Sequence, residues 1–153
     1  MGRINFKFSK KGHQSGENKL LALCRAKQWD EAQRRATKCP LEALPIKVVA
    51  GDTALSVACE KKAPFVTIHV IAEAEKSQIS HRSSPNGETA IHIAIRSGVS
   101  SESIDLLTSI DISNERKALM SEDIKGRTPL HYLIRRYLYG ETISLQSIRK
   151  VVE

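Results

Sequence analysis

Hydrophobic residues recur at intervals of three and four positions through most of the chain beyond residue 16, which is the spacing of amphipathic helices. Leu20, Leu21, Leu23 and Cys24 predict one short helix, and residues 29–36 predict the next. Further along, the same spacing predicts helices at 65–71, 101–110 and 142–152. Each of these is expected to be the second helix of a pair. The chain is therefore expected to be all-α and built from pairs of short helices.

One eight-residue frame occurs three times, at residues 51–58, 87–94 and 126–133. Its shared form is Gly-x-Thr-(Ala/Pro)-(Leu/Ile)-(His/Ser)-x-(Ala/Leu). The threonines of successive copies lie 36 and 39 residues apart, and a period in this range is typical of stacked supersecondary units. The frame, with a helix pair in each interval, predicts a chain of repeated units.

Each position of the frame has a physical use at the start of a helix. Glycine accepts the positive φ of a tight turn, and threonine can cap the helix that follows. Pro129 stands in the first helical turn, where it removes no hydrogen bond. The Leu or Ile and the later Ala fall on one face, and the small residue lets neighbouring helices approach. The residues assigned to this structural motif are Gly51, Thr53, Leu55, Gly87, Thr89, His92, Gly126, Thr128, Pro129 and His131.

A degenerate copy of the unit lies upstream of the first frame. Leu21 precedes Leu55 by 34 residues, in step with the later units, but this copy lacks the Gly-x-Thr frame and has a polar side rich in Lys and Arg. An N-terminal capping unit needs such a side because its outer face meets water. We predict a flexible basic tail at 1–16 and one domain at 17–153. The domain is expected to consist of four units, at 17–44, 45–80, 81–118 and 119–153.

Thr128-Pro129-Leu130-His131 reads as the Thr-Pro-Leu-His signature of ankyrin repeats, and Thr89-Ala90-Ile91-His92 is a close variant. Over roughly residues 18–153 the chain resembles the ankyrin-repeat family. The resemblance implies an ankyrin-type solenoid of stacked helix–turn–helix repeats, about three in number, with a degenerate capping helix pair at the N-terminus. It also implies that His92 and His131 tie the turn of one repeat to the next.

The match to the family includes Asp123, which precedes Gly126 by three residues and corresponds to the acidic residue that begins the family's hairpin. The chain also departs from the family pattern. Ser56 replaces His in the first frame, and Leu133 replaces Ala in the third. The intervals exceed the usual ~33 residues, and the extra length falls in 74–85 and 111–124.

Composition and motif content argue against several classes of protein. The apolar stretch 46–55 is interrupted by Lys47, Gly51 and Asp52, and a membrane span takes about 20 apolar residues. The three cysteines are odd in number and no secretory signal is recognisable, so a cytoplasmic or nuclear location is expected. No zinc-ligand spacing, nucleophile elbow, phosphate loop or His-Glu-x-x-His helix occurs. We expect no metal, no cofactor and no enzymatic activity, with Cys24 and Cys59 serving as core residues.

The resemblance places partner binding on the hairpin tips and the exposed side of the first helices. The candidate residues are Asp52, Glu60, Lys61, Glu88, Arg96, Lys125, Arg127, Arg135, Arg136 and Tyr137. Asp52 and Glu88 are expected on a solvated rim. The third unit is strongly basic and carries Tyr137, so we predict a partner protein or peptide that offers an acidic patch. A solvated basic face that serves solubility is the open alternative.

The net charge of +7 leaves a second class of function open. Residues 1–19 hold five basic residues and one acidic residue, which is more than half of the excess. This tail and the basic third unit can attract nucleic acid or an anionic membrane surface, although no aromatic platform or nucleic-acid module accompanies them. We expect a monomer in isolation, and further repeats can follow Glu153 in a longer protein.

Overall fold

The computed structural model describes residues 18–44, 51–83, 85–140 and 149. Within these ranges every regular element is a helix, so the prediction of an all-α protein is confirmed for them. The predicted tail at 1–16 lies outside the described residues, and so does the predicted helix at 142–152 apart from Arg149. None of the described helices is both long and apolar enough to cross a membrane.

The helices fall at the places that the hydrophobic pattern predicts. The α-helices are α1 (Lys19–Arg25), α2 (Trp29–Lys38), α3 (Ala54–Glu60), α4 (Phe65–Ala74), α5 (Ala90–Ser97), α6 (Ser101–Ser113) and α7 (Pro129–Leu138). Two short 3₁₀ helices, η1 (Pro40–Ala43) and η2 (Lys76–Ile79), follow α2 and α4.

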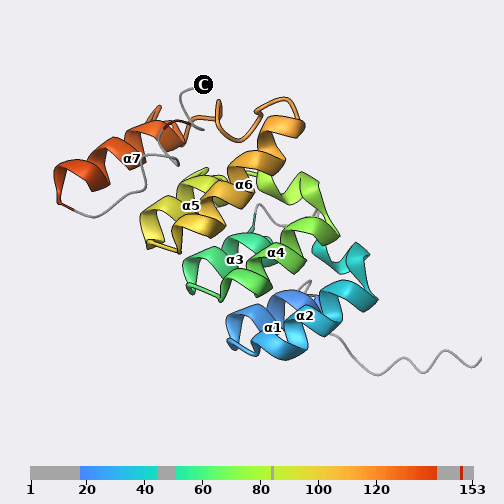
Figure 1. Cartoon of the computed structure of the whole chain (residues 1–153). Helices are drawn as coiled ribbons and strands as arrows, with labels where there is room; N and C mark the ends of the chain where they lie inside the picture. Colours follow the sequence, from blue (N-terminus) through green and yellow to red (C-terminus); the bar gives the residue numbers. More distant parts are fainter. Residues whose placement is uncertain (1–17, 45–50, 84, 141–148, 150–153) are drawn as a thin grey trace, which may run out of the picture.

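The helices pack in two layers (Figure 1). One layer contains α1, α3, α5 and α7, each in contact with the next, and the other contains α2, α4 and α6 in the same order. Each of α1, α3 and α5 also packs against the helix that follows it in the chain. The largest fully buried side chains come from both layers and include Leu20, Leu55, Ile68, Ile71, Ile91, Ile95, Leu107 and Leu133.

Small residues allow the helices of the layer formed by α1, α3, α5 and α7 to approach one another closely. Ala58 of α3 and Ala94 of α5 are completely buried, in agreement with the frame. Cys24 and Cys59 are also buried, which confirms their placement on apolar faces. Burial raises the pKa of both thiols to about 12, so they remain protonated and behave as small hydrophobes at neutral pH.

The three threonines of the frame are N-caps, as predicted. In each copy the backbone N–H of the threonine donates to the side chain three residues later. The acceptor is Ser56 Oγ for Thr53 at 2.9 Å, and His Nδ1 for Thr89 and Thr128 at 3.2 and 3.1 Å. Serine and histidine are thus equivalent as capping residues, which explains why the first frame tolerates Ser56.

The extra residues of the long connections are organised by two buried polar side chains. Gln78 in η2 accepts a hydrogen bond from the backbone N–H of Leu55 and donates to the carbonyl oxygen of Ile71, both at 3.2 Å. Asp111, at the end of α6, accepts from the backbone N–H groups of Ala118 and Leu119 at 2.9 Å. Gln78 thus bonds backbone groups near the ends of α3 and α4, and Asp111 bonds backbone groups within the connection itself.

Candidate functional site

The turn before α7 is closed by a carboxylate. Asp123 accepts hydrogen bonds from the backbone N–H groups of Lys125 and Arg127, at 2.8 and 2.9 Å. Gly126 lies in this turn with φ +69°, and Gly87 has φ +66° before α5. The prediction of positive φ is confirmed for these two glycines, and the acidic residue that the resemblance singled out begins the turn.

The helices α5 and α7 and the turns before them surround a hollow of about 720 Å³, which we call the basic hollow. It brings together six of the candidate binding residues, namely Glu88, Arg96, Lys125, Arg127, Arg135 and Arg136. Asn86, Tyr132 and Tyr139 complete its lining. Five cationic side chains and one carboxylate therefore face the same space.

A smaller hollow of about 170 Å³ adjoins the first one on the side of α3, and we call it the acidic hollow. It contains two further candidates, Asp52 and Glu60, and it shares Asn86, Glu88 and Arg96 with the basic hollow. The remaining candidates, Lys61 and Tyr137, are exposed and line neither hollow. The hairpins and first helices thus form two neighbouring sites of opposite charge.

The expectation that Glu88 lies on a solvated rim is wrong. Its side chain is only 5% exposed, and both Arg96 and Tyr132 contact its carboxylate. Arg96 Nε and Nη2 donate to the two carboxylate oxygens at 3.0 and 3.1 Å. The Tyr132 hydroxyl lies 2.8 Å from Oε1, and the backbone carbonyl of Glu88 accepts from the N–H of Ser83 at 2.7 Å. Asp52, by contrast, remains partly exposed and faces Arg25 at 3.5 Å.

A polar network forms the wall of the basic hollow beneath α7. The Tyr132 hydroxyl lies 2.8 Å from Asp123 Oδ2 and accepts a hydrogen bond from Arg127 Nη2 at 2.9 Å. Arg127 Nε also donates to Asp123 Oδ2 at 2.8 Å. Glu88 joins the same hydroxyl from the α5 side. Two carboxylates and two guanidinium groups therefore hold one another in fixed positions around one phenol.

The hydrogen bonds of this network keep the carboxylate of Asp123 ionised. Burial alone raises the pKa of Asp123, but hydrogen bonds from Arg127 and Tyr132 outweigh it and hold that pKa well below its usual range. Burial and the bonds to the two carboxylates raise the pKa of Tyr132, which keeps the phenol protonated. The ion pair Arg127–Asp123 thus persists at neutral pH.

The other three cations of the basic hollow are Arg135, Arg136 and Lys125. Arg135 lies over the ring of Tyr139, with its guanidinium carbon 5.8 Å from the ring centroid. Arg136 Nη1 donates to the carbonyl oxygen of Ile95 at 3.1 Å. Lys125 is exposed at the turn before the helix. The five cations that line the hollow outnumber the two carboxylates of its wall, Glu88 and Asp123, so the hollow carries an excess of positive charge.

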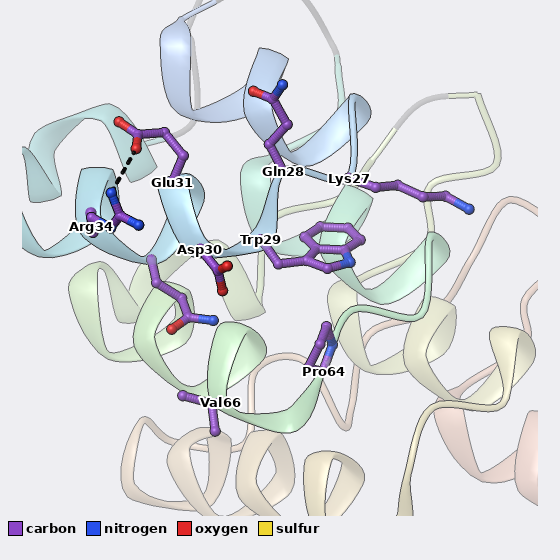
Figure 2. Close-up of a pocket in the computed structure, with 9 residues that line it drawn as sticks. Lys27, Gln28, Trp29, Asp30, Glu31, Arg34, Pro64 and Val66 are labelled. Carbon is purple, nitrogen blue, oxygen red and sulfur yellow. Dashed lines mark hydrogen bonds and ion pairs between the residues drawn. The ribbon is translucent and has the colours of Figure 1, made fainter.

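A third hollow lies away from the candidate residues, between the turns that precede α2 and α4. Figure 2 shows the indole of Trp29 at its centre, with Pro64 and Val66 on the α4 side and Lys27 at its edge. Asp30, Glu31 and Arg34 also line it, and Glu31 pairs with Arg34 at 3.4 Å. Its charges balance, so it favours neither sign of partner.

Sequence reasoning missed Tyr132, Tyr139 and Trp29 as lining residues. Tyr132 occupies the variable position of the frame just before the buried Leu133. Nothing in the frame therefore indicated that its side chain lines a hollow. Tyr139 lies four residues after Arg135, a spacing that signals contact on one helix face.

Among the described residues, no three His, Cys, Asp or Glu side chains are grouped to hold a metal ion.

The chain matches no protein-family model and no curated protein. The ankyrin-repeat resemblance therefore rests on the residues of the chain itself.

Proposed function

We propose that the chain is a divergent ankyrin-type solenoid that binds a partner protein or peptide without catalysing a reaction. The partner docks on the face formed by the hairpin tips and the first helices, over the basic hollow. The convergence of five cationic side chains on that hollow is the observation that carries the proposal.

The ankyrin assignment is supported by three features that recur in register. The frame begins α3, α5 and α7 with the same threonine cap. The first helices contact one another in chain order, as stacked repeats do. His92 Nε2 lies 2.9 Å from the carbonyl oxygen of Arg127 in the next hairpin, which is the tie between repeats that the resemblance implies.

A partner with acidic groups is supported by the charge of the basic hollow. Arg96 and Arg127 are held by buried carboxylates, so their guanidinium groups lose little conformational freedom on binding. Arg135 and Tyr139 add a cation stacked on an aromatic ring. Arginine and tyrosine are frequent anchors in protein interfaces because they combine contact area with hydrogen bonding.

The proposal is tested by affinity capture from nuclease-treated lysate with the full chain and with the variant Lys125→Glu/Arg135→Glu. A control variant, Lys38→Glu/Lys117→Glu, makes the same change of charge at exposed residues outside both hollows. Proteins retained by the wild type and the control, and lost by the first variant, support the proposal. Identical capture by all three chains contradicts it.

The second candidate function is binding of a polyanion, which the net charge of +7 favours. It uses the basic tail and the cations of α7. Capture that disappears with nuclease, or that survives Lys125→Glu/Arg135→Glu and fades when residues 1–16 are removed, favours this function over the first.

A further inference from the structure

The charge of the proposed binding face changes sign within a short distance. The acidic hollow and the basic hollow share one wall, which consists of Asn86, Glu88 and Arg96. Because Glu88 and Arg96 neutralise each other in a bidentate ion pair, the shared wall itself is close to neutral. The sign on either side is therefore set by other residues.

On the α3 side those residues are Asp52 and Glu60. Asp52 faces Arg25 at 3.5 Å, but both side chains are more than one-third exposed, so water screens this pair. Glu60 is exposed at the end of α3. On the α7 side, Lys125 and Arg135 lie in the basic hollow. A ligand that crosses the wall thus meets carboxylates on one side and cations on the other.

The distance between the two sites is set by helix packing. The hollows lie on either side of α5, between α3 and α7, and packed helices are about 8–10 Å apart. An extended peptide advances about 3.3 Å per residue. Successive side chains of an extended peptide point to opposite faces, so only side chains an even number of positions apart face the same surface. Side chains two positions apart (about 7 Å) and four positions apart (about 13 Å) therefore bracket the spacing of the two hollows.

We propose that the partner segment is bipolar: an extended peptide that places an Asp or Glu side chain in the basic hollow and a Lys or Arg side chain, about two or four residues away on the same face, in the acidic hollow. This inference rests on the proposed function and specifies the ligand of that same face. A uniformly acidic peptide fits less well, because its second charge meets Asp52 and Glu60. A nucleic-acid strand fits less well for the same reason, since its phosphates continue past the shared wall.

The test is selection of random peptides displayed against the full chain, followed by affinity measurement with the enriched peptides. We expect enriched sequences to carry an acidic and a basic residue about two or four positions apart. The variant Asp52→Lys/Glu60→Lys should weaken their binding about three- to tenfold, as expected for exposed charge pairs. Changing the basic residue of the peptide to Glu should restore binding to this variant. The control Glu73→Lys/Glu115→Lys, at exposed residues outside both hollows, should bind as the wild type does.

The outcomes separate this inference from the function on which it rests. Enriched peptides that are acidic, lack the paired basic residue and bind Asp52→Lys/Glu60→Lys as tightly as the wild type overturn the bipolar ligand and leave the proposed function standing. Enriched peptides that are insensitive to Lys125→Glu/Arg135→Glu overturn both. Failure to enrich any peptide also overturns the inference, because the inference requires that a linear peptide segment can bind this face by itself.

Discussion

The imidazole of His92 joins α5 to the next hairpin through the carbonyl oxygen of Arg127, 2.9 Å from Nε2. The other ring nitrogen, Nδ1, accepts from the backbone N–H of Thr89, so the hydrogen-bond network assigns the proton to Nε2. The same residue therefore caps its own helix and ties that helix to the turn that carries Lys125 and Arg127.

Replacing His92 by serine should separate these two roles. Serine can keep the cap, as Ser56 does in the first frame, but it cannot reach Arg127. The lost bond leaves a part-buried carbonyl without its partner, and we expect unfolding to become easier by about 1–3 kcal/mol. Urea denaturation measures the change. His131→Ser is the matched control, since His131 is exposed and should tolerate serine with little loss.

Stability should also fall as the pH is lowered from 7 to 5. Burial lowers the pKa of His92 below 6.5, so the unfolded chain takes up a proton that the folded chain resists. The stability that the neutral imidazole contributes is present above pH 6.5 and is lost as the pH falls toward the lower folded-state pKa. Urea midpoints at several pH values measure this slope.

The variant His92→Gln removes the titrating group and should flatten the slope between pH 7 and 5. Burial raises the pKa of Asp111, so its contribution to the pH dependence of stability is opposite in sign to that of His92. The variant leaves Asp111 intact, so this contribution is the same in both chains. The comparison of the two slopes therefore isolates His92. Equal slopes in both chains mean that His92 titrates normally in the folded state.

Tyr132→Phe should destabilise the protein although it deletes only one oxygen atom. That hydroxyl lies 2.8 Å from both Glu88 Oε1 and Asp123 Oδ2, so its removal takes a hydrogen-bonding group away from two buried carboxylates. We expect a loss of about 1–3 kcal/mol, seen as a lower urea midpoint. Tyr137→Phe, at a side chain that is 64% exposed, should leave the midpoint unchanged. Equal midpoints for both variants would contradict the buried network.

Leucine at Ala58 or Ala94 should overpack the contacts between the first-layer helices. Both alanines have no exposed surface, and α3 contacts α5 directly. The expected cost is about 1–3 kcal/mol in urea or thermal unfolding. Ala22→Leu, on the exposed side of α1, serves as the control and should cost far less. An unchanged melting curve for Ala58→Leu and Ala94→Leu would mean that these faces are not in contact.

The helices and their caps could be predicted because both leave local signals. Apolar spacing placed α1, α2, α4 and α6, and the Gly-x-Thr frame located the starts of α3, α5 and α7. Cys24 and Cys59 followed from the same periodicity. These features depend on residues within one or two helical turns, which sequence spacing records directly.

The surroundings of Glu88 could not be predicted in the same way. Its burial depends on Tyr132, which is 44 residues further along the chain, and no local pattern links the two. Gln78 and Asp111 stabilise connections through single side-chain contacts, which leave no periodic trace. The sequence identified most of the charged residues of the proposed binding face, but the division of that face into an acidic and a basic hollow depends on how the helices pack.

The central claim is that the basic hollow binds acidic groups, and nuclear magnetic resonance tests it residue by residue. A short peptide with two Glu residues in a Gly-Ser background is titrated into the isotope-labelled full chain at low salt, where charge pairing is least screened. We predict chemical-shift changes that cluster at Arg96, Lys125, Arg127 and Arg135 and vanish in Lys125→Glu/Arg135→Glu. Changes confined to residues 1–16, or equal changes in the wild type and the variant, would contradict the account.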